Sequence, residues 1–146
     1  MDHYKLFLKL KQENKKYETE ASRRINEKYN VTTTKFNDTF AYDFITSNGL
    51  KYEVKADKAS EKHGNFFIEF LQFNKPSGIS ITESDYYIIT DTKNYYLILV
   101  DDIKAIIENQ RNKKHIVIKN FTNSVGGTTS GFVIKKELII KKSIEI

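Results

Sequence analysis

The sequence predicts an α/β protein in which a mixed β-sheet of about five strands is flanked by helices. Apolar residues near the start of the chain recur with helical spacing, and β-rich runs separated by turn signals follow. A second helical stretch comes after the last clear strand. The 146 residues include one proline and no linker-like stretch, so we expect residues 1–146 to form a single domain.

The first expected element is a helix over residues 6–29, a stretch that is rich in strong helix formers. Within it Tyr17, Ala21, Ile25 and Tyr29 occur at every fourth position. This spacing aligns the four side chains in one stripe along the helix. The stripe is the predicted packing face.

A β-hairpin is expected next. Residues 40–45 are aromatic and β-rich, and they run into residues 47–49, Ser-Asn-Gly, a strong tight-turn signal. In residues 50–56 apolar and charged side chains alternate. The apolar residues therefore share one face of that strand, and Glu53 and Lys55 share the other.

The remaining elements follow from the same signals. Residues 65–70 predict a third strand whose Glu69 points away from the apolar face. Residues 74–78 indicate a loop, and residues 86–90 and 95–100 indicate two strands, followed by a helix capped by Asp101 or Asp102. Short β-rich runs at residues 115–118 and 132–134 and a loop at Gly126-Gly127 complete the chain, and their order in the sheet stays open.

Composition narrows the class of protein. The chain has no cysteine, which excludes disulfides and thiolate zinc sites, and its three histidines lack the spacing of a zinc protease site. Residues 1–5 lack the layout of a signal peptide, and charges interrupt every apolar run, so we expect a cytoplasmic protein without a membrane partner. A net charge of +5 favours a polyanion as partner, although lysine-rich surfaces also serve solubility.

The hairpin carries the residues with the most specific chemistry. Adjacent strands lie roughly 5 Å apart, so Asp43 and Glu53 would share a metal ion if the register places them on one face. Two converging carboxylates suit a hard cation such as Mg²⁺. Lys55 would project towards the same phosphate, and the backbone carbonyl of Val54 would be a further oxygen ligand.

Asp43 followed about ten residues later by Glu53, Val54 and Lys55 resembles the signature of the PD-(D/E)XK nuclease superfamily, with Tyr42 at the position of the proline. The resemblance implies a restriction-endonuclease-like core and a Mg²⁺-dependent endonuclease that hydrolyses DNA phosphodiester bonds, with Mn²⁺ expected to substitute. It implies that Asp43 and Glu53 bind the metal and that Lys55 positions or activates the attacking water.

The resemblance also extends to residues outside the hairpin. Glu20 matches best the acid that many members carry on the first helix, and Glu18 is the alternative, because helical register does not decide between them. Glu69 would add a further carboxylate to the site. The loop around Lys75 and Ser77 is similar to that of small phage and archaeal-resolvase-like members, in which it would approach DNA.

Other interpretations stay open. Asp43 and Glu53 would, in the simplest alternative, lie on a solvated sheet face and pair with lysines. A nuclease-like domain that binds nucleic acid without cutting it, and a non-catalytic interaction protein, are the other functional hypotheses. The DNA substrate is also open among junction-resolving, restriction, repair, homing and nicking enzymes, and a homodimer would suit paired cuts.

Overall fold

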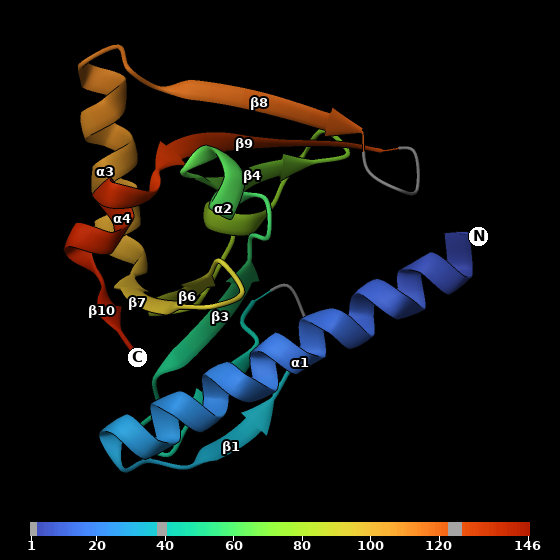
Figure 1. The fold of residues 1–146 in the computed structure, drawn as a ribbon, viewed down its shortest axis with the longest axis vertical. Helices are drawn as coiled ribbons and strands as arrows, with labels where there is room; N and C mark the ends of the chain where they lie inside the picture. The colour runs from blue at the N-terminus through green and yellow to red at the C-terminus, as the bar shows by residue number, and fades with distance from the viewer. Residues whose placement is uncertain (1–2, 38–40, 123–126) are drawn as a thin grey trace.

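The computed structural model describes residues 3–37, 41–122 and 127–146 and has an α/β fold (Figure 1). Its helices are α1 (His3–Tyr29), α2 (Ser60–His63), α3 (Val100–Asn112) and α4 (Lys136–Lys142), with the 3₁₀ turn η1 (Gly78–Ser80). Its strands are β1 (Thr33–Phe36), β2 (Phe44–Thr46), β3 (Lys51–Ala56), β4 (Asn65–Gln72), β5 (Lys75–Pro76), β6 (Tyr86–Thr90), β7 (Tyr95–Leu99), β8 (Val117–Thr122), β9 (Thr128–Lys135) and β10 (Ile144–Glu145).

The strands form two sheets. A six-stranded sheet has the order β1-β2-β3-β6-β7-β10 and is mixed, because β3 and β6 run parallel while the other neighbours are antiparallel. A four-stranded antiparallel sheet has the order β5-β4-β9-β8. Parallel strands need a long crossover connection. Here the segment that joins β3 to β6 contains α2, β4, β5 and η1, so the crossover itself belongs to the second sheet.

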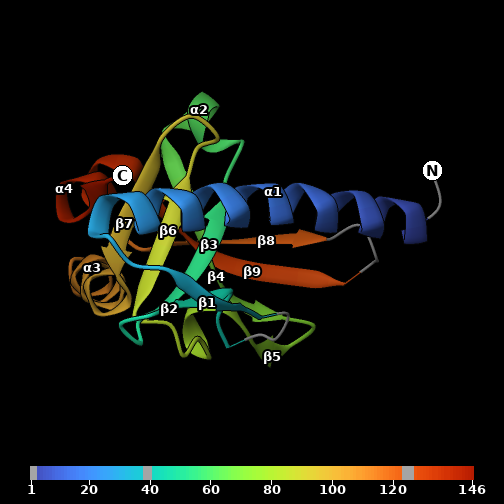
Figure 2. The same cartoon turned by 90° about the horizontal axis from the view of Figure 1, so that it is seen from below.

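Helix α1 covers one face of the six-stranded sheet (Figure 2). Ala21 and Ile25 are fully buried, and Tyr17 is partly buried beside them, which confirms most of the predicted stripe. Tyr29, at the end of the stripe, is 40% exposed. The buried partners of the helix come from β2, β3, β6 and β7: Phe44, Tyr52, Ile88, Tyr95 and Leu97.

The second sheet, α3 and α4 bury the opposite face of the six-stranded sheet. Tyr87 and Ile89 of β6 point into this cluster, whereas Ile88 between them points towards α1, as strand alternation requires. The other buried members come from β4, η1, β7, α3, β9 and α4: Phe66, Ile68, Ile79, Tyr96, Ile98, Val100, Ile103, Ile107, Phe132, Ile134 and Ile139.

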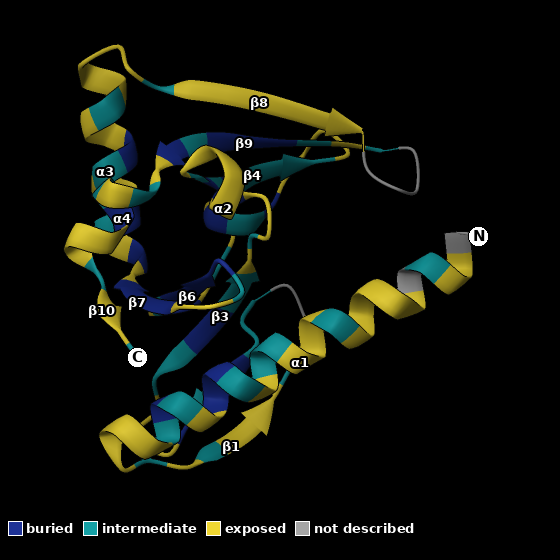
Figure 3. Cartoon of the chain, viewed as in Figure 1, coloured by how far each residue is buried: buried dark blue, intermediate teal, exposed yellow. Residues whose placement is uncertain are grey.

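Two parts of the molecule project in the same direction. The N-terminal half of α1 and the far ends of β8 and β9 extend from the body on one side in both views (Figures 1 and 2). All six residues of β8 are exposed, and most of the described residues in the first half of α1 are exposed too (Figure 3). These projecting parts flank the site described below.

The hairpin and the main strands agree with the sequence-based predictions. The amide of Thr46 donates to the carbonyl of Leu50 at 3.0 Å, and Gly49 adopts a φ of +83°, as a tight turn requires. Strand β2 begins at Phe44, whereas the predicted strand began at Phe40, which lies outside the described residues, as does Gly126.

Some predictions were wrong. Helix α3 begins at Val100 with Leu99 at its N-cap and no capping side chain, so Asp101 and Asp102 lie in its first turn, where carboxylates suit the helix dipole. The sheet of about five strands is instead a sheet of six and a sheet of four in the described part of the chain. No described helix combines the length and the apolar character needed to cross a membrane.

Candidate active site

Glu53 and Lys55 lie on β3 and share a face, as the alternation predicted. Tyr52 and Val54 pack towards α1, which turns Glu53 and Lys55 to the other side of the sheet. The Lys55 ammonium lies 3.9 Å from a carboxylate oxygen of Glu53. Only 8% of the Glu53 side chain is exposed, compared with 38% of the Lys55 side chain. The carboxylate therefore lies inside the protein, and the lysine lies at the protein surface.

The hairpin register brings Asp43 to the same place. The Asp43 amide donates to the Tyr52 carbonyl at 2.8 Å, and the Asp43 carboxylate accepts a hydrogen bond from the Val54 amide at 2.6 Å. The N–H and C=O groups of one strand residue point to the same side. The Val54 carbonyl therefore faces the side on which Asp43 lies, as a shared metal site would require.

The acid that α1 contributes is Glu18. Its side chain hydrogen-bonds to the Asp43 carboxyl, a contact that lowers the pKa of Asp43 against the larger effect of burial. Glu20 instead accepts hydrogen bonds from Arg23 and Arg24, which hold the pKa of Glu20 near 2. The structure therefore places Glu18 with Asp43 and places Glu20, the residue that the family resemblance favoured, in a separate ion-pair cluster.

Glu69 reaches the site from the second sheet. It is half-buried on β4, and its charge contributes to raising the pKa of Glu53. The loop after β4 packs against it: Gly78 has a φ of +51°, and a Cβ there would lie 2.3 Å from the Glu69 carbonyl oxygen. Lys75 is exposed on β5, whereas Ser77 is buried and its hydroxyl has no hydrogen-bond partner among the described residues.

Tyr87 joins these residues, although no sequence motif singled it out. It lies opposite Glu53 in the parallel pairing of β3 with β6 and is 1% exposed. Its hydroxyl faces the Glu53 carboxylate and interacts with it, an effect that lowers the pKa of Glu53, but this contact falls outside strict hydrogen-bond geometry in the described part of the chain. A buried hydroxyl with such an incomplete contact has room for a further hydrogen bond to a bound water or ligand.

The surroundings of the carboxylates oppose their ionisation. Burial is the main cause that raises the pKa of Glu53 to about 7; Asp43 and Glu69 add to the shift, and Lys55 opposes it. Burial also raises the pKa of Asp43, against the effect of the Val54 amide and Lys55. Acids in such surroundings favour a bound cation, because a cation replaces the protons that they otherwise retain.

A cavity of about 470 Å³ opens beside these groups, between α1, β3, β4, β6 and β8. Lys55, Glu69 and Tyr87 line it, together with the exposed His63 at the end of α2. The cavity therefore gives a ligand access to the lysine and to at least one of the carboxylates.

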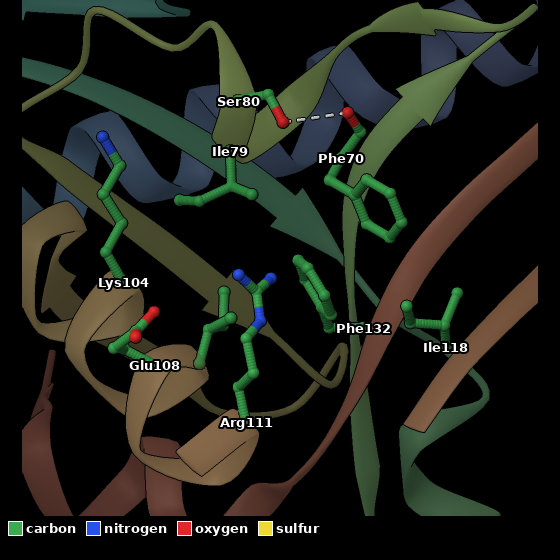
Figure 4. A pocket seen from close by; sticks show the side chains of 9 residues that line it. Phe70, Ile79, Ser80, Lys104, Glu108, Arg111, Ile118 and Phe132 are labelled. Atoms are coloured by element: carbon green, nitrogen blue, oxygen red, sulfur yellow. Dashed lines mark hydrogen bonds between the residues drawn. The ribbon is translucent and has the colours of Figure 1, made fainter. Parts of the chain in front are cut away.

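A second pocket, of about 370 Å³, lies between α3, η1 and β9 (Figure 4). It combines Lys104 and Arg111 with aromatic rings, and its Ser80 hydroxyl is satisfied by the Phe70 carbonyl at 2.9 Å. None of the clustered carboxylates lines it. Lys55, Glu69 and Tyr87 line the first cavity instead, and Asp43 and Glu53 lie beside it without lining it.

The residues fit a magnesium ion better than a fully coordinated structural metal. No three His, Cys, Asp or Glu side chains within residues 3–37, 41–122 and 127–146 form a ready metal-binding group. Magnesium, however, is usually held by one or two carboxylates together with waters and substrate phosphates. Asp43, Glu53 and the Val54 carbonyl are the oxygen groups that could hold such an ion, with the Tyr87 hydroxyl beside Glu53.

Comparisons with protein-family models, with curated proteins and with solved structures find no match to this chain.

Proposed function

We propose that this protein is a Mg²⁺-dependent endonuclease of the PD-(D/E)XK type that hydrolyses phosphodiester bonds in DNA. The observation that carries the proposal is the convergence of Asp43, Glu53 and Lys55 at one end of the hairpin, beside a cavity. A buried and a partly buried acid, both with raised pKa values and with a lysine nearby, are poorly explained as a solvated sheet face.

The arrangement of elements supports a restriction-endonuclease-like core. Helix α1 precedes the hairpin and supplies Glu18, β4 supplies Glu69, and the β7–α3 unit follows. These are the features that the resemblance led us to expect, with Glu18 in place of Glu20. The crossover through β4 and β5 is an addition to that expectation.

The residues divide the chemistry between them. Asp43, Glu53 and the Val54 carbonyl would hold Mg²⁺, which when bound polarises a phosphate and makes water a stronger nucleophile. Lys55 orients the attacking water and offsets the negative charge that develops on the phosphate. The Tyr87 hydroxyl, which faces Glu53, would donate a hydrogen bond to a water or phosphate oxygen beside that carboxylate, and ionised Glu53 requires a pH near or above 7.

The test is a cleavage assay on supercoiled, branched and single-stranded DNA with Mg²⁺, with Mn²⁺ and with EDTA. We expect metal-dependent cuts by the wild type and a loss of about 100-fold or more in Asp43→Asn, because the variant lacks one metal-binding carboxylate. Lys93→Ala, which removes an exposed lysine paired with Glu61, is the matched control and should cut normally. Cleavage that persists in EDTA or in Asp43→Asn at the wild-type rate contradicts the proposal.

A further inference from the structure

Aromatic rings form one wall of the cavity beside the carboxylates. Phe67 of β4 and Phe121 of β8 both line it and meet edge to face, with ring centroids 5.1 Å apart. Phe121 is 43% exposed, although large apolar side chains are usually buried. The Lys119 ammonium lies 5.0 Å from the centre of the Phe121 ring, which adds positive charge to this wall.

The same cavity is lined by three polar groups of the candidate active site. Lys55, Glu69 and Tyr87 line it together with the two phenylalanines. Its volume of about 470 Å³ lies within the range of small-molecule sites, roughly 300–1,000 Å³. A ligand that fills it therefore meets ionic groups in one part and flat apolar rings in another.

Two carboxylates that line this cavity already interact with positive or N–H groups of the protein. This pairing reduces their repulsion of an anionic ligand. Glu13 of α1 forms an ion pair with Lys58 at 3.1 Å. The Asp57 carboxylate accepts hydrogen bonds from the backbone amides of Ser60 and Phe67. Each of these two carboxylates therefore already has a partner within the protein.

A nucleotide combines the two chemistries, because it joins an anionic phosphate to a planar base that stacks on aromatic side chains. A base inside a duplex is paired and stacked, so it reaches such a wall only when it is single-stranded or extruded. We propose that this cavity binds an unpaired nucleotide of DNA, with its base against Phe121 and Phe67 and its phosphate towards Lys55. This substrate preference rests on the proposed nuclease function.

Two projecting parts of the molecule lie next to the cavity. The cavity has α1 residues on one side and Phe121 of β8 on another. The N-terminal half of α1 and the β8–β9 strands extend beyond the body in the same direction (Figures 1 and 2). A DNA strand with one nucleotide in the cavity would therefore meet residues of both α1 and β8.

Photo-crosslinking of the full chain tests the proposal without requiring cleavage. Three DNA probes carry one 5-iodouracil and are irradiated with the protein in EDTA: a short single strand, its perfect duplex, and a duplex in which the modified base is bulged out. We expect crosslinks to Phe121 or Phe67, found by peptide mass spectrometry, with the single strand and the bulge but not with the duplex. The first two probes distinguish a free strand from an extruded base as the source of the nucleotide.

Variants of Phe121 give a second readout. Phe121→Ala should lower the affinity for the single strand at least about fivefold, because stacking on an aromatic ring is lost, whereas Phe121→Tyr should retain it. Val117→Ala is the matched control, since Val117 is an exposed apolar residue on the same strand but does not line the cavity. Melting temperatures of all variants show whether each is folded.

Three results overturn the proposal: crosslinks only outside the cavity, equal affinities for Phe121→Ala and Val117→Ala, or no binding of any probe. If the protein cuts DNA with metal but its crosslinks lie outside the cavity, the proposed nucleotide site is wrong and the proposed nuclease function stands. Crosslinks in the cavity of a protein that never cuts DNA support the nucleotide site and remove the nuclease function.

Discussion

At the scale of single residues, Glu53 has the clearest energetic consequence. Its pKa is raised from 4.5 to about 7, mainly by burial, so the folded protein retains a proton that the unfolded chain releases. The stability from this proton is fully present below the unfolded pKa of about 4.5 and is lost as the pH rises through about 7. The loss amounts to at most about 3.5 kcal/mol, at about 1.4 kcal/mol for each pKa unit.

We therefore predict that Glu53→Gln is more stable than the wild type at pH 8, by about 2 kcal/mol, and similar to it at pH 4. The neutral amide imposes no comparable pH dependence. Urea unfolding at the two pH values measures the difference. Glu83→Gln, which changes an exposed glutamate, should follow the wild type at both. A Glu53→Gln variant with the wild-type pH dependence would show that burial does not perturb this carboxylate.

Mg²⁺ should bind the Glu53 carboxylate and thereby stabilise the folded protein. Because a ligand that binds only the folded state stabilises it, Mg²⁺ at pH 8 should raise the melting temperature of the wild type. Asp43→Asn and Glu53→Gln should lose this response, while Glu83→Gln should keep it. Calorimetry with and without Mg²⁺ measures the shift independently of cleavage. Equal shifts in all four proteins would place the metal elsewhere.

Tyr87 is predicted to position an oxygen near Glu53. Since its hydroxyl contacts the Glu53 carboxylate outside strict hydrogen-bond geometry among the described residues, Tyr87→Phe should change the free energy of unfolding by no more than about 1 kcal/mol. Its kcat for DNA cleavage should fall about tenfold at constant KM, because a hydrogen bond made in the transition state is lost. Tyr96→Phe, on neighbouring β7, is the control. A Tyr87→Phe enzyme with wild-type kcat would show that the hydroxyl has no part in the reaction.

The sequence was informative about residues only where chemistry and short-range geometry coincide. Asp43, Glu53 and Lys55 are joined by one tight turn, so local register places them together. Tyr87 depends on the parallel pairing of β3 with β6, which no local pattern encodes. The choice of Glu18 over Glu20 depends on how α1 is rotated on the sheet, because residues two positions apart on a helix point in nearly opposite directions.

At the scale of elements, the packing of the η1 loop on β4 holds Glu69 in place. Gly78 combines a positive φ with a contact that leaves no room for a Cβ. Gly64 provides a matched comparison, since it has a φ of +69° and no atom within 4 Å of an added Cβ. Alanine substitutions at these two glycines therefore distinguish the cost of a positive φ from the cost of a steric clash.

We predict that Gly78→Ala loses about 2 kcal/mol more stability than Gly64→Ala, because only the former forces β4 and the loop apart. Its DNA cleavage should also fall, since Glu69 is displaced. Urea unfolding and cleavage rates of the two variants measure these effects. If the two substitutions are equally destabilising, the close approach to Glu69 contributes nothing.

Periodicity predicted α1, the hairpin, β4, β6 and β7 because each presents a regular apolar face. It did not predict the second sheet, in which β4 pairs with β9 across a long sequence separation. Strand β8 has no buried residue and therefore no alternating pattern to detect. Helix α4 is seven residues long, too short to show a helical repeat clearly.

At the scale of the whole molecule, two buried clusters lie on opposite faces of the six-stranded sheet, and the candidate active site lies where β3 approaches β4 of the second sheet. The geometry of the candidate active site therefore depends on the packing of both clusters. Composition gave the size and the positive charge, but it did not indicate that one domain would contain two sheets with a cavity between their elements.

The most direct test of the central claim is the single-turnover rate at which labelled DNA is cut in Mg²⁺ by the wild type, Lys55→Ala and Lys93→Ala. If Lys55 acts on the attacking water beside Asp43 and Glu53, its removal lowers the rate about 100-fold or more, while the Mg²⁺-induced rise in melting temperature and the rate of Lys93→Ala are retained. A wild type that does not cut DNA in Mg²⁺, or a Lys55→Ala variant that cuts as fast as the wild type, would contradict the claim.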